Sequence, residues 1–410
     1  MTVRDQTRTS RTLAGIATSP LFGMLAKAGR LKAAGRPVIS LTAGEPDFDT
    51  PAHIVAAAKA AMDAGQTRYT PVAGTPSLKA AIATKLQRDN GLTYALQEII
   101  ATTGAKQALF NFCLATLDPG DEVIFAAPYW PSYVDMVRLA GGREVIVPTS
   151  ADENFRFHPE ALQAVLTPRT KAVFFNSPGN PSGALYSADD WQALARVLQR
   201  HPRVLLVSDE IYEHIRFDDG PHVGLLNAVP GLRDRTVLIN GVSKSYAMTG
   251  WRIGFAAGPR DLIDAMEAVQ SHSTSNPCSV AQAAAGEALS GDQSSVRRMA
   301  EVFRGRHARL VNALQRVPGL GCRPAGGAFY LMLDARGLIE AHRRGRDDPS
   351  FGDVALTDWL LERHDLALAA GSWFGAPGFL RCSFAASDAA LDEAVRRLME
   401  ASHEVHASGP

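Results

Sequence analysis

The sequence predicts an α/β fold, in which a large domain with a mostly parallel sheet between helices is joined to a smaller α+β domain. The chain has 410 residues, more than one ordinary domain contains. Apolar, strand-like runs alternate with helical patterns, as is typical of a parallel sheet between helix layers. From Ser294 the pattern changes. We expect residues 1–45 to form an N-terminal arm and a small-domain segment, residues 46–293 the large domain, and residues 294–410 the small domain.

The large domain contains the alternating runs. Its expected strands lie at 122–126, 144–148, 171–176, 203–208, 236–240 and 254–257. Most of these runs are continuously apolar, which indicates strands that are buried on both faces. A helix is expected after Ser187, because Ser187 and Asp190 suit a capping box at its start.

The small domain is expected to open with a long, arginine-rich helix from Ser294 to about Val317. Strands should follow near 328–333 and 379–384, with helices that close the domain. The charged segment 342–353 contains several residues that break helices, and we expect a surface loop there without chemistry of its own.

The composition favours a cytoplasmic protein that acts on small molecules. Lys and Arg together number 42, as do Asp and Glu, so no overall charge draws the chain to nucleic acid or to membranes. No apolar stretch reaches the roughly 18 residues that a membrane helix needs. The four cysteines are scattered and form no Cys-x-x-Cys pair, as expected of reduced thiols. His403 and His406 have no third ligand nearby, so we expect no metal site.

Lys244 is the most informative residue, because it follows an expected strand and precedes Arg252 by eight residues. Most lysines in such loops are solvated surface residues. Burial and a neighbouring positive charge would both disfavour its ammonium form, and a neutral amine can form a Schiff base with an aldehyde. Since Arg252 could hold a phosphate of the same ligand, the pair indicates an aldehyde phosphate.

Asp209 stands at the end of the next strand back, with Tyr212 three residues later. A buried acid is unfavourable without a partner. A protonated pyridine nitrogen would be such a partner, with a gross attraction of roughly 4 kcal/mol at about 4 Å and an effective dielectric near 20. Asp209 also suits a helix N-cap. The segment that contains Asn180, taken alone, is also compatible with an ordinary turn.

Three further segments offer ligand contacts. Gly104 and Ala105 open a helix, and small residues there leave backbone N–H groups free for an anion. Trp130 lies in an aromatic cluster that could stack on a pyridine ring, although aromatic residues after a strand are more often core. Arg381 lies in an apolar strand with no acid within ten residues upstream, which makes a substrate carboxylate a reasonable partner.

These motifs, taken together, resemble the class I and II aminotransferases, which are pyridoxal phosphate enzymes of fold type I. The resemblance extends from about Val38 to about Arg397. The subgroup that looks most similar is the bacterial aspartate/prephenate aminotransferases. The motifs that carry the resemblance lie, in order, at 41–50, 68–74, 176–183, 208–214 and 243–254.

The resemblance implies pyridoxal 5'-phosphate as cofactor and a role for each candidate residue. Lys244 would form the Schiff base, Asp209 would pair with the ring nitrogen, and Asn180 and Tyr212 would contact the ring's phenolic oxygen. Trp130 would stack on the ring. It further implies a cis bond between Asn180 and Pro181. The residues that would surround the phosphate are Gly104, Ala105, Ser243, Arg252 and, from a second subunit, Tyr69. Those that would hold the substrate α-carboxylate are Arg381, Gly44 and Asn180.

Lys106 resembles the residue of the subgroup that reaches a side-chain carboxylate, which favours aspartate, glutamate and their 2-oxo acids. Two positions depart from the subgroup. Ala17 stands where a lysine is usual, and the missing cation weakens the case for prephenate. Gly241 stands where the wider family often has a phosphate-binding serine, for which Ser243 would compensate.

The expected activity is a ping-pong transamination in amino acid metabolism, by a homodimer with shared sites to which Tyr69 and the segment 271–276 contribute. An aromatic or kynurenine-type aminotransferase, or a β-lyase acting on cysteine conjugates, is an alternative on the same fold. A ligand-sensing regulator with an aminotransferase-like domain would need a DNA-binding module ahead of Val38, where we expect no room for one.

Overall fold

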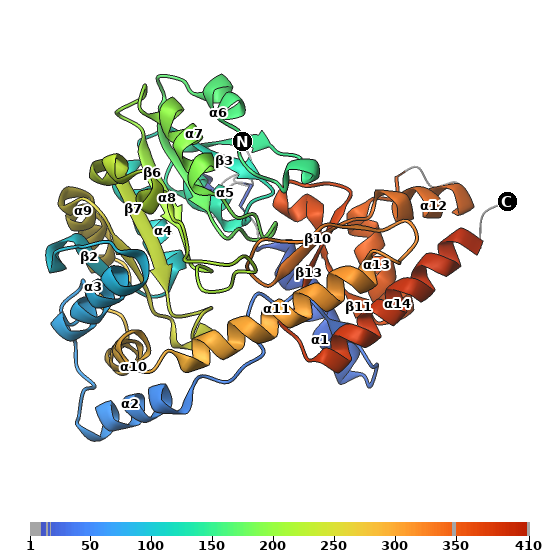
Figure 1. Ribbon diagram of the computed structural model, residues 1–410, viewed down its shortest axis with the longest axis horizontal. Coiled ribbons are helices and arrows are strands. Elements are labelled where there is room, and N and C mark those ends of the chain that lie inside the picture. Colours follow the sequence, from blue (N-terminus) through green and yellow to red (C-terminus); the bar gives the residue numbers. More distant parts are fainter. Residues whose placement is uncertain (1–9, 14, 17, 347–349, 408–410) are drawn as a thin grey trace, which may run out of the picture.

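The computed structural model describes residues 10–13, 15, 16, 18–346 and 350–407. Figure 1 shows a large sheet surrounded by helices, drawn in blue to yellow, beside a smaller body drawn mostly in orange and red. The division of the chain at residues 45 and 293 stays a prediction.

The large sheet is mixed but mostly parallel, as predicted. Among the described residues it has seven strands. One strand, Gly254–Ala257, runs antiparallel to both of its neighbours, while all other neighbouring strands are parallel. The order across the sheet is β2 (Ile99–Thr102), β8 (Gly254–Ala257), β7 (Thr236–Gly241), β6 (Leu205–Asp209), β5 (Thr170–Asn176), β3 (Glu122–Ala127) and β4 (Arg143–Pro148). The prediction contained all of these except the four-residue β2.

Both faces of the sheet are covered over its central strands, which explains why most of the strands are continuously apolar. Val173 and Phe175 of β5 belong to one hydrophobic cluster, while Ala172 and Phe174 belong to another. Successive side chains of a strand point to opposite faces, so each cluster fills the space between one face and its helices.

Two of the helices around the sheet begin where the sequence predicted a helix start. The predicted capping box is present, because Ser187 and Asp190 bond reciprocally at the start of a helix. The helix opened by Gly104 starts at Ala105, as predicted. These helices are α2 (Ala52–Asp63), α3 (Pro76–Asn90), α4 (Ala105–Thr116), α5 (Ser132–Leu139), α6 (Pro159–Val165), α7 (Ala188–Leu198), α8 (Leu225–Ala228), α9 (Arg260–Ser271) and α10 (Ser279–Ser290).

The smaller body holds an antiparallel sheet and the C-terminal helices. The sheet order is β12 (Ala369–Ala370), β13 (Phe379–Ser383), β10 (Tyr330–Asp334) and β9 (Gly321–Cys322). The N-terminal segment joins this body, because β1 (Ile39–Ser40) pairs with β11 (Leu366–Ala367). The helices here are α1 (Pro20–Ala33), α11 (Ser294–Leu314), α12 (Arg336–Arg346), α13 (Asp353–His364) and α14 (Asp388–Ala407).

The loop predicted at 342–353 is wrong for its first part, because α12 continues to Arg346. His342 is buried and its ring stacks on Phe351 with 3.5 Å between centroids. The helix therefore has a buried side that the charged sequence conceals. Residues 347–349 lie outside the described residues.

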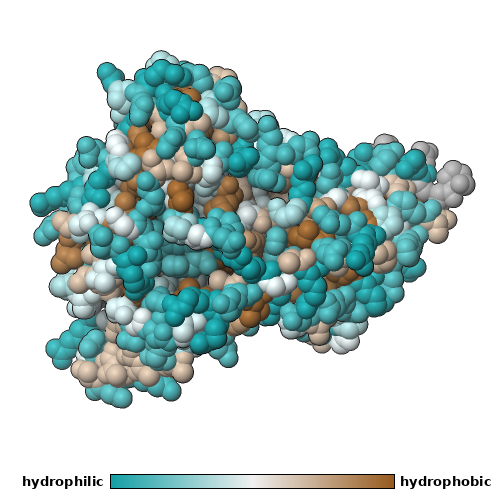
Figure 2. Space-filling view, in the orientation of Figure 1, coloured by the Kyte–Doolittle hydropathy of each residue, from teal (hydrophilic) through white to brown (hydrophobic). Residues whose placement is uncertain are grey.

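The surface is mostly hydrophilic. Hydrophilic residues predominate on the face seen in Figure 2, with hydrophobic residues scattered among them. Within the described part of the chain, no helix is both long and apolar enough to cross a membrane. His406 at the end of α14 donates from Nδ1 to the carbonyl oxygen of Ser402 at 2.7 Å, so it takes part in the helix itself.

Candidate active site

A cavity of about 420 Å³ lies where strands β5, β6 and β7 end. Ligands of α/β sheets commonly bind at this edge. The cavity brings together most of the residues singled out in the sequence: Gly44, Ala105, Lys106, Trp130, Asn180, Asp209, Tyr212, Ser243, Lys244, Arg252 and Arg381. Gly104 lies directly behind Arg252. Tyr69 lies outside the cavity and is 92% exposed.

Lys244 lies in the loop after β7, where its side chain is partly buried. Its Nζ donates a hydrogen bond to the backbone oxygen of Gly44. Burial lowers the pKa of Lys244 to about 8, and Arg252 acts in the same direction, while Glu45 opposes both. The amine is therefore more easily deprotonated than an ordinary lysine, as a Schiff-base lysine must be.

Asp209 is the last residue of β6 and is buried. The hydroxyl of Tyr133 donates to its Oδ2 at 2.7 Å, and the N–H of Ile211 donates to Oδ1 at 3.3 Å. Burial raises the pKa of Asp209 to about 6, although the hydrogen bond from Tyr133 acts in the opposite direction. Turns rather than a helix follow Asp209, so the N-cap alternative does not apply.

Arg381 lies at the other end of the cavity and is 1% exposed. It donates from Nη1 to Oδ1 of Asn180 at 3.1 Å and from Nη2 to the backbone oxygen of Thr42 at 2.6 Å. Its Nε is buried without a hydrogen-bond partner. The guanidinium lies 4.6 Å from the ring centre of Tyr330 and 4.7 Å from that of Phe374. No carboxylate pairs with Arg381 within the described residues, so it is free to bind one.

The start of α4 and Arg252 are packed tightly together. Gly104 has a φ of 80°, and a Cβ there would lie 2.5 Å from Nη2 of Arg252. A Cβ on Gly254 would overlap the backbone nitrogen of Ala105. The two glycines thus let a helix N-terminus approach a guanidinium, which makes a cradle for a phosphate.

Gly241 also has a steric explanation. A Cβ at this position would lie 2.9 Å from the backbone oxygen of Ile253 and 3.0 Å from Cα of Gly254. The close approach of β7 and β8 therefore excludes the serine that is frequent in the wider family. Ser243 lines the cavity and is the nearest hydroxyl in sequence that can serve instead.

Lys106 and Trp130 lie together at the wall of the cavity. The Nζ of Lys106 lies 4.7 Å from the ring centre of Trp130. Burial lowers the pKa of Lys106, and Arg252 lowers it further. Three apolar side chains of α1 also line the cavity: Leu21, Phe22 and Leu25.

Several residues of the site were missed in the sequence. Tyr133 lies in the aromatic cluster three residues after Trp130, but the sequence pattern did not indicate its contact with Asp209. Asn176 accepts from the N–H of Asn180 at 2.7 Å and donates to the backbone oxygen of Asp209 at 2.9 Å. As the polar last residue of an apolar strand, it carried a signal that could have identified it. The hydroxyl of Tyr330 lies 3.0 Å from that of Tyr212, and no local pattern pointed to it.

The bond between Asn180 and Pro181 is cis, as the family resemblance implied. Ala17, which stands where the subgroup usually has a lysine, lies outside the described residues.

The cavity fits pyridoxal phosphate on its own chemistry. It offers an amine with a lowered pKa, a buried carboxylate for a pyridine nitrogen, and a cradle of glycines and arginine that added methyl groups would fill. At the opposite end, Arg381 has an unpartnered buried Nε. Each part of the cofactor and one substrate carboxylate would thus meet a suitable group.

Comparison with known proteins agrees with this geometry. Residues 36–398 match the family model described as aminotransferase class I and II. The chain is 48% identical over 389 residues to an aspartate/prephenate aminotransferase of Nitrosomonas europaea, covering 95% of this chain and 98% of that protein.

Solved structures are similar as well. The aspartate aminotransferase from Rhizobium meliloti superposes with a TM-score of 0.93 at 46% identity, covering 97% of this chain and 99% of that one. The Thermus thermophilus aspartate aminotransferase with maleate has a TM-score of 0.88 at 41% identity, covering 97% and 100%. Fold and site define a pyridoxal phosphate-dependent transferase. The chain belongs to the class I and II aminotransferase family.

Proposed function

We propose that this aminotransferase moves an amino group between a dicarboxylic amino acid, of the aspartate or glutamate type, and a 2-oxo acid in a ping-pong cycle. The observation that carries the proposal is that Arg381 and Lys106 line one cavity, and neither pairs with a carboxylate among the described residues. A substrate with a carboxylate at each end would supply both partners. The name of the Nitrosomonas relative and the maleate in the Thermus structure support this class of substrate.

The catalytic roles follow from position and charge. Bound pyridoxal phosphate supplies an electron-withdrawing ring and a carrier for the amino group. Lys244 removes the substrate's α-proton and returns it, since burial lowers its pKa to about 8, closer to neutrality than that of an ordinary lysine. Asp209 would keep the proton on the ring nitrogen of the bound cofactor, and the hydroxyl of Tyr133 holds Asp209 in place. Tyr212 and Asn180 orient the ring through its oxygen.

The remaining residues bind and orient. Arg381 holds the α-carboxylate with help from Asn180 and Gly44, and Lys106 holds the side-chain carboxylate. Trp130 would pack against the ring of the bound cofactor. Gly104, Ala105, Ser243 and Arg252 would bind its phosphate.

Two experiments test these assignments. Lys244→Ala should abolish turnover and the pH-dependent absorbance band that the Schiff base of Lys244 gives the cofactor-loaded protein, whereas an active variant would refute the role of Lys244. Single half-reactions should be followed with aspartate, glutamate, phenylalanine, kynurenine and cystathionine. Aspartate and glutamate should react fastest, and Lys106→Ala should lower kcat/KM about 10-fold or more for aspartate but little for phenylalanine. A wild-type preference for phenylalanine would refute the substrate assignment.

That outcome would support the second candidate, an aromatic-type aminotransferase. It is favoured by the apolar side chains of Leu21, Phe22 and Leu25, which line the cavity beside Trp130. Phe22 is 56% exposed, so a larger apolar substrate would cover it.

The functional unit we propose is a symmetric homodimer in which Tyr69 completes the phosphate site of the partner. An aromatic side chain with 92% exposure is unusual, and burial against a second copy would account for it. Light scattering should give the mass of a dimer. Tyr69→Phe should weaken cofactor binding without dissociating the dimer. A fully active monomer would contradict the proposal.

We place this dimer in the cytoplasm. Its thiols support this location, because Cys113, Cys322 and Cys382 are free and buried and Cys278 is free and exposed. Fractionation of cells that produce the protein tests it.

A further inference from the structure

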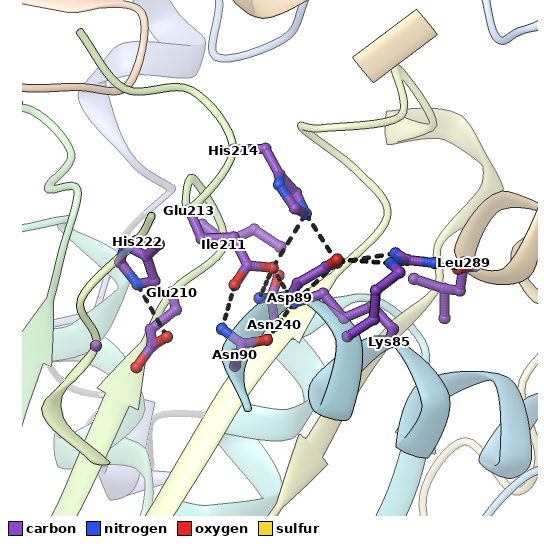
Figure 3. Close-up of polar contacts among 12 residues, drawn as sticks. Lys85, Asp89, Asn90, Glu210, Ile211, Glu213, His214, His222, Asn240 and Leu289 are labelled. Atoms are coloured by element: carbon purple, nitrogen blue, oxygen red, sulfur yellow. Dashed lines mark hydrogen bonds and ion pairs between the residues drawn. The ribbon is translucent and has the colours of Figure 1, made fainter. Parts of the chain in front are cut away.

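A buried polar cluster lies behind the active site, on the opposite side of the segment that carries Asp209 and Tyr212. Figure 3 shows its side chains, most of which come from α3, from residues 210–214 and from the end of β7, with His222 from the loop that follows residues 210–214. Tyr212 lines the cavity, whereas the next residue, Glu213, is only 3% exposed and belongs to the cluster. The catalytic segment therefore has a polar anchor on its far side.

Lys85, Asn90 and Asn240 bind the carboxylate of Glu213, and Nε2 of His214 lies 3.4 Å from its Oε1. The ammonium of Lys85, from α3, forms an ion pair with Oε1 of Glu213. The amide of Asn90 donates to Oε2 at 2.7 Å, and the amide of Asn240 donates to Oε1 at 2.8 Å. Burial alone would raise the pKa of Glu213, but the charge and hydrogen bond of Lys85, together with the neighbouring His214 and His222, outweigh burial and lower that pKa to about 2. Glu213 is thus a fully bonded carboxylate that would be costly to displace.

The contact with Asn240 joins the two catalytic segments. Asn240 lies in β7, and its Oδ1 also accepts a hydrogen bond from the backbone N–H of Gly241 at 2.7 Å. Lys244 follows in the same loop. The paired register of β6 and β7 ends where Asp209 lies opposite Ile239. Beyond that point the hydrogen bond between Asn240 and Glu213 continues the connection between the segment that follows β6 and the end of β7.

The same cluster has the composition of a metal site, because Glu210, Glu213 and His222 offer ligand atoms within 4.8 Å of one another. Protein groups already use these atoms. Lys85 neutralises Glu213, while Glu210 accepts from Ser208 at 2.7 Å and lies 3.0 Å from Nε2 of His222. A divalent cation there would be repelled by the ammonium of Lys85.

We propose that Glu213, neutralised by Lys85, is a positioning residue for transamination: through Asn240 it fixes the segment that carries Asp209 and Tyr212 relative to the loop that carries Lys244. This inference rests on the proposed roles of those three residues. Glu213, Lys85 and Asn240 do not line the cavity, so they act only through those residues.

The experiment compares Asn240→Ala with Asn111→Ala. Asn111 is also fully buried in the large body, and its amide donates to Oε1 of Gln270 at 2.9 Å, but it contacts neither catalytic segment. Both variants lose a buried side-chain amide, so both should lower Tm. The deciding readout is the pH midpoint of the visible absorbance of the pyridoxal phosphate-loaded protein.

Asn240→Ala should move this midpoint by about half a pH unit or more and lower kcat about 10-fold with little change in KM, since geometry around Lys244 changes. Asn111→Ala should leave midpoint and kcat unchanged. A wild-type midpoint in Asn240→Ala would overturn the inference. If that variant does not fold, Asn240→Ser is measured instead, and an unshifted midpoint has the same meaning. Failure of the proposed function is distinguishable, because the wild-type protein itself would then show no pH-dependent band.

Discussion

The hydroxyl of Tyr133 donates a hydrogen bond of 2.7 Å to Oδ2 of Asp209, and both residues are buried. A bond to a charged group is worth about 1.5–3 kcal/mol. Tyr133→Phe should therefore raise the pKa of Asp209 further and lower kcat/KM for aspartate about 10-fold or more. Steady-state kinetics measure this. Tyr129→Phe is the control, because Tyr129 packs on Phe125 with 5.1 Å between ring centres. Equal kinetics of the two variants would exclude the role of Tyr133.

The buried amine of Lys244 predicts how stability depends on pH without cofactor. Its pKa is lowered from 10.5 to about 8 in the folded chain, so the unfolded chain binds more protons between these values. Stability should rise with pH across this window, by up to about 3 kcal/mol from this group. Lys244→Met should lack that rise and should be more stable than the wild type at pH 7. Urea unfolding at pH 7 and pH 10 measures both, and a rise that persists in Lys244→Met would assign it to other groups.

Arg381 should be sensitive even to a conservative change. Arg381→Lys keeps the positive charge but loses the planar fork that binds a carboxylate with two hydrogen bonds. We expect kcat/KM to fall about 10- to 100-fold, corresponding to about 1.5–3 kcal/mol. Arg397→Lys is the matched control, because Arg397 is also buried but donates to backbone oxygens of Pro37 and Asp365. Kinetics that are alike in both variants would contradict the assignment.

Gly104 should be required for cofactor binding. The methyl group of Gly104→Ala would push against Arg252 and should weaken binding of pyridoxal phosphate about 10-fold or more. Equilibrium dialysis gives the Kd. Gly120→Ala separates this clash from backbone strain, because Gly120 also has a positive φ, of 92°, but open space around its added Cβ. If both changes weaken binding equally, the close approach is not the cause.

Removal of Lys85 should destabilise the protein strongly. In Lys85→Met the carboxylate of Glu213 would remain buried without its counter-charge, which typically costs about 3–5 kcal/mol. The loss should grow as pH rises above about 4.5, the ordinary pKa of Glu, because ionisation then becomes unfavourable in the folded chain. Denaturant unfolding between pH 4 and pH 8 measures it. Lys85→Met/Glu213→Gln, which removes both charges, should recover part of the loss at pH 8.

The sequence was informative where function depends on strand ends. Asp209 ends one apolar strand and Lys244 follows the neighbouring strand of the sheet. Because ligands bind where such strands end, the two residues could be expected in one site. Arg381 was predictable for a different reason, since an arginine in an apolar strand without a nearby acid requires a partner from elsewhere.

Contacts between distant parts of the chain were not predictable in this way. Tyr330 approaches Tyr212 from the smaller body, and Lys85 reaches Glu213 from a helix far earlier in the chain. Nothing in the local patterns specifies such pairs, because they depend on how the bodies and layers pack. Helix α12 was hidden for a related reason, since the ring that His342 packs on, Phe351, lies beyond the helix.

The direction of β8 has a consequence for engineering. Because β8 runs against β7, residues 242–253 form a single hairpin connection with Lys244 near its start and Arg252 near its end. The distance between the amine of Lys244 and the guanidinium of Arg252 is thus set by the length of one loop. An inserted or deleted residue between them would misalign both contacts at once, so variation intended to recruit larger or smaller ligands is better placed in α1, where the cavity wall can change while that spacing is preserved.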